Sequence, residues 1–251
     1  MIGGKRQGQF IIISGLLVFI MGVGAAFSSM VNVWISATFL VIFALPAVVF
    51  LFKSIPRERA LLAVLLFMAF PVFMESIGIT TGVPYGEFEY TGAMGPKVFG
   101  LVPLTAVLVF LPLVAGSVAL AQRFTRRPPY VIVLGALLLV ASDLVLDPCA
   151  VEIGLWVWAS PGIYYGVPIS NFVGWALVGL FTSSVMHYLA SNHEKRALHG
   201  GTIIGIFLTI SFWTGFSIYS GLLIPGALGL ALTVFSLRKI LKDFGKGGSG
   251  E

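Results

Sequence analysis

Eight apolar runs, each close to the length of a membrane-crossing helix, dominate this sequence. A transmembrane helix needs about 20 mostly apolar residues. The chain has 58% hydrophobic and 10% charged side chains among its 251 residues, and a mean hydropathy of +1.01. Such a composition lies outside the range of soluble domains and predicts an all-α integral membrane protein with about eight transmembrane helices. The expected spans are residues 10–27, 31–52, 60–79, 99–121, 130–147, 169–190, 201–219 and 221–237.

The spans are expected to form one polytopic domain over residues 1–246, followed by an appended linker at 247–251. The first span could be mistaken for a signal peptide. Its apolar stretch is long, however, and no clean small-x-small cleavage site follows, so we interpret it as a span. The boundary near residues 220–225 contains no charged residue, which leaves open either a tight hairpin or one broken helix.

Positive charges mark one side of these spans. Fourteen of the fifteen Lys and Arg residues precede the first span or follow an even-numbered one, and Lys97 is the exception. Because cytoplasmic loops carry an excess of Lys and Arg, we expect a multi-pass cell-membrane protein with both termini in the cytoplasm. The fourteen are Lys5, Arg6, Lys53, Arg57, Arg59, Arg123, Arg126, Arg127, Lys195, Arg196, Arg238, Lys239, Lys242 and Lys246.

The carboxylates are distributed differently. Six of the ten lie at the outer ends of the third and fifth spans or in the loops that follow. Desolvation and like-charge repulsion both disfavour the charged form of a carboxyl, so we expect some of these groups to be neutral near neutral pH. A neutral carboxyl can act as a general acid. The six are Glu75, Glu87, Glu89, Asp143, Asp147 and Glu152, and for Glu87, Glu89 and Glu152 the alternative is an ordinary solvated loop acid.

Asp143 and Asp147 are four residues apart and therefore lie on one face of a helix. Acids inside a membrane are costly and mark functional sites by default, and paired carboxyls can divide the roles of acid and base. Since Pro148 disfavours helix at the preceding residue, we expect the fifth span to end with Asp147 at the outer rim. Asp143 would lie one turn deeper, and Glu75 would lie similarly near the outer end of the third span.

The loops after the third and fifth spans resemble each other. Each contains a glycine, an aromatic-x-aromatic unit, an aromatic-Gly pair and a proline before the next span. The aromatic units are Phe88 with Tyr90, and Trp156 with Trp158. The pattern predicts a parallel duplication of a two-span unit, spans three and four with spans five and six, with chance similarity as the alternative. Repeats of this kind often place a site at their interface.

Four motifs carry a resemblance to a known family. They are "ESIGITTGVPYGEFEYT" (75–91), "GPKVFGLVP" (95–103), "DLVLDPCAVEIGLWVW" (143–158) and "GIYYGVPISNFVGW" (162–175). Together they are similar to the membrane carotenoid biosynthesis family, which includes bisanhydrobacterioruberin hydratases and carotenoid 1,2-hydratases. The resemblance implies an enzyme that adds water across the terminal isopropylidene double bond of an acyclic carotenoid. The substrate would be bisanhydrobacterioruberin or a lycopene-type molecule, and no redox cofactor would be needed.

The chemistry of hydration suggests roles for the acids. Protonating the alkene needs an acid, and activating water needs a base. We expect Asp143 or Glu75 to donate the proton and Asp147 to deprotonate water, with no metal or cofactor. The carotenoid would enter from lipid into a channel lined by spans three to six, where aromatic rings could stabilise a cation. Residues expected to bind it are Tyr85, Glu87, Glu89, Tyr90, Trp156, Trp158, Tyr164, Tyr165, Asn171 and Trp175.

The sequence is also compatible with other functions. Acids within a membrane also mark the ion pathways of proton-coupled transporters, although here they gather at one depth instead of forming a relay. A non-catalytic carotenoid-binding protein and an enzyme acting on another polyprenoid end group are further alternatives. Other enzymes of the carotenoid pathway are conceivable partners, and no nucleic-acid-binding module is found.

Cysteine and histidine contribute little to the functional prediction. A single cysteine, Cys149, excludes an intrachain disulfide framework. The three histidines, His187, His193 and His199, lie toward the predicted cytoplasmic side, and their spacing of six matches no helical face. We therefore do not expect a metal site.

Overall fold

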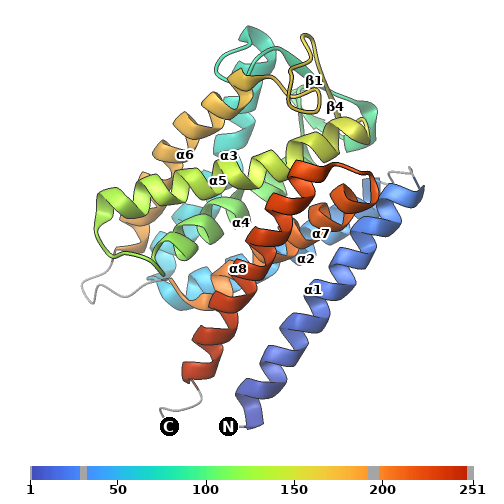
Figure 1. The fold of residues 1–251 in the computed structure, drawn as a ribbon. Coiled ribbons are helices and arrows are strands. Elements are labelled where there is room, and N and C mark those ends of the chain that lie inside the picture. The colour runs from blue at the N-terminus through green and yellow to red at the C-terminus, as the bar shows by residue number, and fades with distance from the viewer. Residues whose placement is uncertain (1, 29–32, 192–197, 248–251) are drawn as a thin grey trace.

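The computed structural model describes residues 2–28, 33–191 and 198–247. Within these residues eight helices are long and apolar enough to cross a membrane, which confirms the predicted fold class (Figure 1). The helices are α1 (Ile2–Ser28), α2 (Val33–Ser54), α3 (Arg57–Thr81), α4 (Leu104–Ala121), α5 (Pro128–Glu152), α6 (Ile169–Ala190), α7 (Ile203–Tyr219) and α8 (Leu223–Gly247). His193, Glu194, Lys195, Arg196 and all of the expected linker except Gly247 lie outside the described residues.

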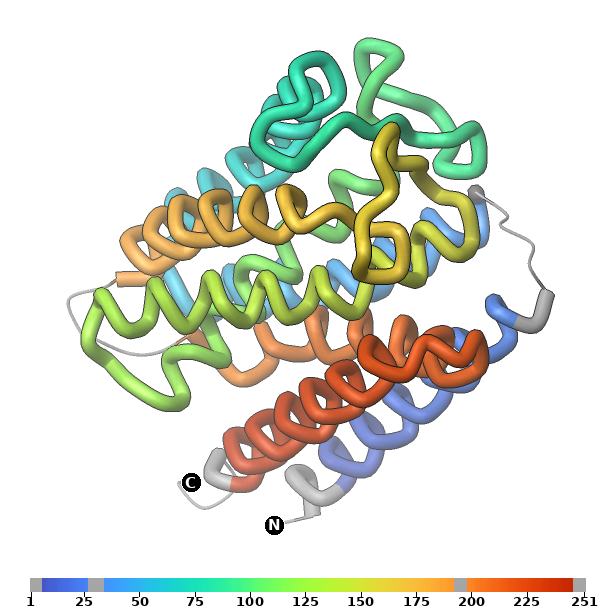
Figure 2. The backbone as a smooth tube through the Cα atoms, turned by 45° about the horizontal axis from the view of Figure 1, so that its top comes forward, coloured from blue at the N-terminus to red at the C-terminus, as the bar shows by residue number. Residues whose placement is uncertain are grey.

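Helices α4 and α7 form the centre of the bundle, because most of their residues are buried by neighbouring helices. Helix α7 packs against α1, α2, α4, α5 and α8, and Figure 2 shows α1 and α8 side by side at one edge. The α1–α7 contact depends on glycine. A Cβ atom on Gly22 would lie 1.9 Å from the backbone oxygen of Phe212, and one on Gly215 would lie 2.1 Å from that of Phe19. The two backbones therefore approach through small residues, as is common between transmembrane helices.

Several boundaries differ from the predicted ones. Helix α4 begins at Leu104 instead of residue 99, because the strands β2 (Lys97–Val98) and β3 (Val102–Pro103) form a short antiparallel hairpin before it. Helices α7 and α8 are separate, and Gly221 between them adopts a φ of +72°, which glycine tolerates without strain. This settles the open boundary in favour of a tight hairpin.

The two similar loops meet at one end of the bundle. Strand β1 (Phe88–Tyr90) pairs antiparallel with β4 (Trp156–Trp158), so the two aromatic-x-aromatic units lie opposite each other (Figure 1). The beginning of α1 and the end of α8 lie at the other end, where a Cβ on Gly8 would be 3.2 Å from Leu241. The pairing brings the similar segments together, whereas duplication of a two-span unit stays a prediction.

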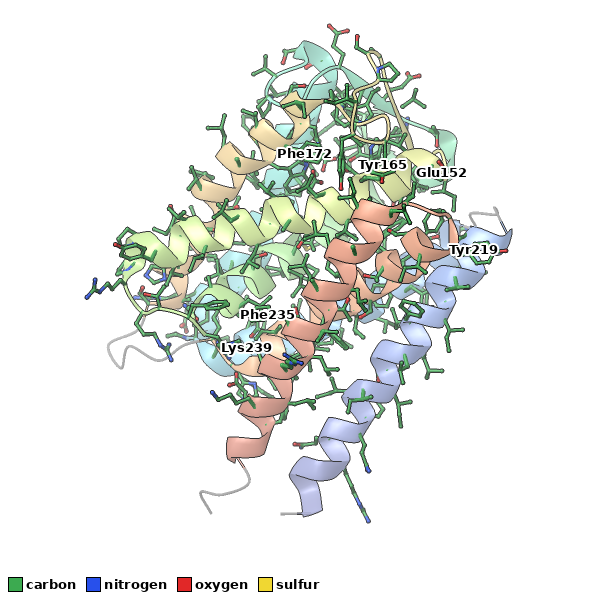
Figure 3. The ribbon with its side chains drawn as sticks, in the orientation of Figure 1. Glu152, Tyr165, Phe172, Tyr219, Phe235 and Lys239 are labelled. Carbon is green, nitrogen blue, oxygen red and sulfur yellow. The ribbon has the colours of Figure 1, made fainter. Side chains whose placement is uncertain are left out.

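The end opposite the paired loops holds a partly buried ion pair. Arg123 donates from Nε and Nη2 to Oδ2 of Asp243, at 2.9 and 2.5 Å, and so ties the end of α4 to α8. Figure 3 shows Lys239 toward this end and Glu152 and Tyr165 near the paired loops. His199 stacks on Phe50 beside the ion pair, with ring centroids 4.6 Å apart. Burial is the main reason that the pKa of His199 is lowered from its usual range.

Candidate active site

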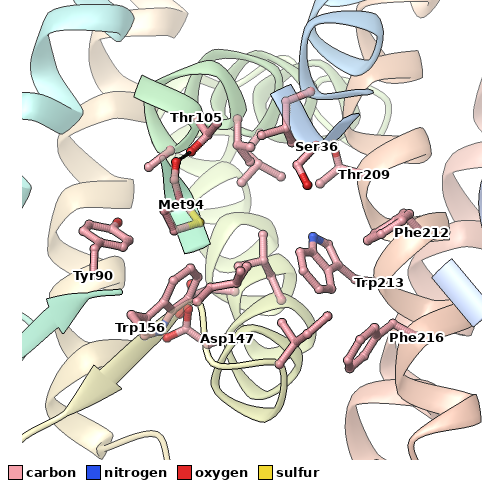
Figure 4. Close-up of a pocket in the computed structure, with 18 of the residues that line it drawn as sticks. Ser36, Tyr90, Met94, Thr105, Asp147, Trp156, Thr209, Phe212, Trp213 and Phe216 are labelled. Atoms are coloured by element: carbon pink, nitrogen blue, oxygen red, sulfur yellow. Dashed lines mark hydrogen bonds between the residues drawn. The ribbon is translucent and has the colours of Figure 1, made fainter. Parts of the chain in front are cut away.

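A cavity of about 580 Å³ lies inside the bundle and reaches the paired strands β1 and β4. Its wall combines residues from α1 to α7 with both strands of the β1–β4 pair, and most of its surface is apolar (Figure 4). The size falls within the range of about 300–1,000 Å³ typical of small-molecule sites. The polar groups in the wall therefore determine what chemistry this cavity can support.

Asp143 and Asp147 lie in this wall on successive turns of α5. Each is only 4% exposed, and Asn171 at the start of α6 is 2% exposed. Nδ2 of Asn171 donates to Oδ2 of Asp143 at 2.8 Å and to Oδ2 of Asp147 at 2.6 Å. One amide thus holds both acids in a fixed arrangement facing the cavity.

Asp147 does not lie at the end of its helix, so the expectation of a position at the rim was wrong. Helix α5 continues through Pro148 to Glu152. A proline in a helix cannot donate a hydrogen bond to the carbonyl four residues earlier, which here belongs to Leu144. The hydroxyl of Tyr164 donates to that carbonyl instead, at 3.0 Å. This bond replaces the missing partner, and the helix continues for about one further turn beyond Asp147.

Glu75 reaches the same cavity from α3. The hydroxyl of Tyr90 donates to Oε2 of Glu75 at 2.7 Å, and Nζ of Lys97 donates to the backbone oxygen of Tyr90 at 2.5 Å. Burial, followed by the neighbouring Glu75, raises the pKa of Tyr90 well above its usual range. The Tyr90 hydroxyl therefore keeps its proton and remains a donor to Glu75.

The three acids lack cationic partners among the described residues, where the one ion pair is that of Arg123 with Asp243. Lys97, the expected cation on this side, binds a backbone carbonyl and not a carboxylate. No three His, Cys, Asp or Glu side chains among these residues are arranged to hold a metal ion. The acids are therefore held by hydrogen bonds from neutral donors.

The paired strands supply an aromatic wall. Side chains alternate between the two faces of a strand, and Phe88, Tyr90, Trp156 and Trp158 all face the cavity. In the pair, Phe88 lies opposite Trp158 and Tyr90 opposite Trp156. Their ring centroids are 5.1 and 5.7 Å apart, respectively. The indole N–H of Trp158 has no hydrogen-bond partner among the described residues, so it can donate to a bound molecule.

The same alternation corrects the prediction for Glu87 and Glu89. Both side chains are exposed and neither lines the cavity. Glu89 stands between the inward-facing residues of β1, opposite Val157, which is 51% exposed. The structure thus places these two acids on the outer face of the loop, where they match the alternative of solvated loop residues.

Tyr85 closes the cavity between α3 and α6. A Cβ on Gly78 would lie 2.8 Å from its ring and one on Gly174 would lie 2.7 Å away, so two helical glycines make room for it. Its ring centroid is 6.1 Å from that of Trp175, which also lines the cavity. Burial, followed by Glu75 and Asp143, raises the pKa of Tyr85 far above its usual range, so its hydroxyl stays neutral.

Tyr164 and Tyr165 do not line the cavity, although both were expected to bind the substrate. The Tyr164 hydroxyl turns to α5, and its ring packs edge-on against Phe172 (ring centroids 5.4 Å apart; Figure 3 labels Phe172). The Tyr165 hydroxyl accepts from the backbone N–H of Ile224 at 3.3 Å. Tyr165 has a φ of +51°, and the hydroxyls of both tyrosines contact helices outside the cavity.

The cavity also has lining residues that the sequence did not single out. Phe212, Trp213 and Phe216 enter it from α7, and Phe39 and Phe43 enter it from α2. These aromatic residues stand within apolar runs with no polar neighbour to set them apart from residues of a packed core. The expected channel of spans three to six is therefore incomplete.

Comparison with known proteins identifies the family. A family model described as carotenoid biosynthesis protein matches residues 12–236. The chain belongs to the carotenoid biosynthesis protein family. The matched region of this family member includes every residue that lines the cavity.

One similar protein has a specific name. The family member is 38% identical over 141 residues to the bisanhydrobacterioruberin hydratase of Haloarcula japonica. The match covers 54% of this chain and 47% of that protein, so it spans about half the length of each. No solved structure gives a significant match.

Proposed function

We propose that this protein is a carotenoid hydratase that adds water across the terminal isopropylidene double bond of an acyclic carotenoid. The observation that carries the proposal is the buried unit of Asp143, Asn171 and Asp147 facing an apolar, aromatic-lined cavity. Simple binding of a hydrocarbon gains nothing from buried acids, because burying polar groups is costly. The similarity to a bisanhydrobacterioruberin hydratase supports the same reaction class.

The reaction needs one proton donor and one proton acceptor. A carboxylic acid transfers its proton to the less substituted alkene carbon, and the π electrons form the new C–H bond. This leaves a tertiary carbocation, to which the oxygen of water bonds. A carboxylate then accepts the extra proton from the added water. Because one proton is donated and one is recovered, no oxidant or reductant is consumed.

Asp143 or Glu75 is the proposed donor, and Asp147 the proposed base. Two carboxyls that accept from the same amide lie too close together to ionise both without strong repulsion, so we infer that one of Asp143 and Asp147 is protonated while the other is ionised. Asn171 contacts both carboxyls and would hold them in place while the proton moves. Tyr90 would orient Glu75 in a corresponding way. A fixed pair of this kind suits general acid–base catalysis.

The aromatic wall suits the intermediate. Trp156, Trp158 and Tyr90 present rings to the cavity that contains the acids. Aromatic faces attract cations, with a gain of about 2 kcal/mol or more at desolvated sites. These rings would therefore stabilise the tertiary cation until water adds. We further propose that both termini are cytoplasmic, which places this site toward the outer leaflet.

The test compares two acids on the same helix. Asp143→Asn removes the proposed acid, whereas Glu152→Gln neutralises an exposed acid that does not line the cavity. Each variant is expressed in a host that produces lycopene or bisanhydrobacterioruberin, membrane insertion is verified, and pigments are analysed by mass spectrometry. We expect addition of one water in wild type and Glu152→Gln, and its loss in Asp143→Asn.

The other outcomes separate the competing functions. Hydroxylated product at the wild-type level from Asp143→Asn would remove that residue from the mechanism. Pigment that co-purifies with wild-type protein but is never hydrated would indicate a binding protein instead. Proton flux across vesicles without hydration would indicate a transporter.

A further inference from the structure

The cavity opens sideways between α1 and α2. Nearly all residues that line it are buried or half-buried, and the largely exposed ones are Gly24 on α1 and Ile35 on α2. Ile35 is 58% exposed. Ala25 and Ser36, which follow them in the sequence, line the cavity and are half-buried. Exposure of lining residues therefore marks a mouth at this position.

The packing of the two helices explains why a mouth exists there. At the described residues α1 and α2 scarcely contact each other, and each packs on α7 instead. Phe212 and Trp213 of α7 line the cavity behind them. Figure 4 shows Ser36, Phe212 and Trp213 across the cavity from Tyr90 and Trp156. The mouth and the aromatic wall thus lie at different ends of the same space.

The surface around the mouth is apolar. Leu17 and Ile20 on α1 are 57% and 62% exposed, and Val41 and Ile42 on α2 are 50% and 48% exposed. In helices that cross a membrane, such side chains face lipid tails. A Cβ added at Gly24 would meet no atom within 4 Å, so there is room for a side chain at this position. The mouth therefore connects the cavity that contains Asp143 and Asp147 with the lipid tails of the membrane.

We propose that the polyene tail of the substrate passes through the α1–α2 mouth and remains in the lipid while the end group lies beside Asp143 and Asp147. The inference rests on the proposed hydratase function. A hydrocarbon tail in lipid has no apolar surface to remove from water, so leaving it outside costs little. The site would then select the end group and tolerate different tail lengths, and α1, α2 and α7 would contribute to substrate binding.

Two isoleucines on α2 provide a matched test. Ile35 lines the mouth, whereas Ile42 is similarly exposed two turns away and does not line the cavity. Ile35→Trp and Ile42→Trp are purified in detergent and assayed with an acyclic carotenoid and with a short terpenoid that has the same end group. The short substrate lies wholly inside the cavity once bound, so only the long substrate keeps a tail in the mouth during the reaction. The measured quantity is the ratio of long-substrate to short-substrate turnover.

We expect Ile35→Trp to lower this ratio about ten-fold or more, since steric misfit of even one methylene changes specificity by about that factor. The ratio for Ile42→Trp should equal that of wild type. Gly24→Trp should repeat the effect from the α1 side, with Gly245→Trp as its control, because both glycines lie in helices with open space around them. Equal ratios in all four variants would overturn the proposed mouth. Wild-type protein that hydrates neither substrate would instead overturn the hydratase function, and the mouth proposal with it.

Discussion

Tyr164 supplies the hydrogen bond that Pro148 removes from α5. Its hydroxyl donates to the carbonyl of Leu144, four residues before the proline, at 3.0 Å. Without a donor there, a helix would be expected to kink or end near Asp147. The relationship connects a loop tyrosine to the position of the acids, although the tyrosine does not line the cavity.

Tyr164→Phe is expected to destabilise the protein by about 1 kcal/mol, the typical net value of one hydrogen bond. In a Pro148→Ala background the alanine N–H can bond to Leu144, so the same substitution should cost clearly less. The free energy of unfolding in detergent, measured for the four proteins of this double-mutant cycle, gives the coupling. Equal costs in both backgrounds would contradict the proposed compensation.

Because of the Tyr164 hydroxyl, we expect the stability of the protein to depend on pH in the alkaline range. Burial, followed by Tyr165, raises the pKa of Tyr164 from 10.0 to about 12. The folded state therefore holds this proton more tightly than the unfolded chain does. Its contribution to stability is fully present below pH 10 and is lost as the pH rises through about 12. Unfolding measured across this window should show a steeper loss for wild type than for Tyr164→Phe, and identical slopes would argue against it.

Asn171→Leu should strongly reduce hydration, because it removes both amide hydrogen bonds to Asp143 and Asp147 while keeping a similar shape. Misplacement of catalytic groups by about 1 Å can lower the rate about 100-fold. The neighbouring Ser170→Ala serves as control, since that hydroxyl donates to the backbone oxygen of Tyr85 and not to an acid. Turnover is measured on verified, folded membrane protein. A similar small effect of both substitutions would exclude Asn171 as the residue that positions the acids.

Gly174→Ala should destabilise the protein by about 1–3 kcal/mol, as overpacking in a tight core does. The new Cβ would lie 2.7 Å from the Tyr85 ring and 2.9 Å from the backbone oxygen of Pro84, and a backbone atom cannot easily yield. Gly245→Ala on α8 has open space and should be neutral or slightly stabilising. Thermal unfolding in detergent distinguishes the two, and matching melting temperatures would refute the close fit around Tyr85.

Loss of Arg123 should destabilise the end of the bundle opposite the site. Arg123→Gln leaves the partly buried carboxylate of Asp243 without its cation. Removing one partner of a fully buried ion pair costs about 3–5 kcal/mol of stability. The side chains of Arg123 and Asp243 are 11% and 29% exposed, so we expect a smaller loss of stability than in a fully buried pair. Adding Asp243→Asn should restore part of the loss, as measured by the free energy of unfolding. If the double variant is no more stable than Arg123→Gln, the ion pair does not carry this contribution.

The length of the apolar runs and the placement of charge determined much of this protein at the level of sequence. Span length and apolar content are local properties, so eight helices could be predicted from the chain alone and were found in the residues that the structure describes. Asp143 and Asp147 could be placed on one face because helical geometry fixes the spacing of four residues. The distribution of Lys and Arg likewise gave an orientation, which stays a prediction.

Tertiary structure decided the rest. Helix α5 continues past Pro148, and the donor that bonds to the carbonyl of Leu144 there comes from Tyr164, a residue outside that helix. Which loop residues faced the cavity depended on the register of β1 with β4, which turns Glu89 outward and Tyr90 inward. Helices α1, α2 and α7 contribute residues to the cavity wall, and this contribution depended on how these apolar helices pack together. The hydropathy of one segment does not specify which distant segment it will contact. For that reason only the folded structure could reveal these contacts.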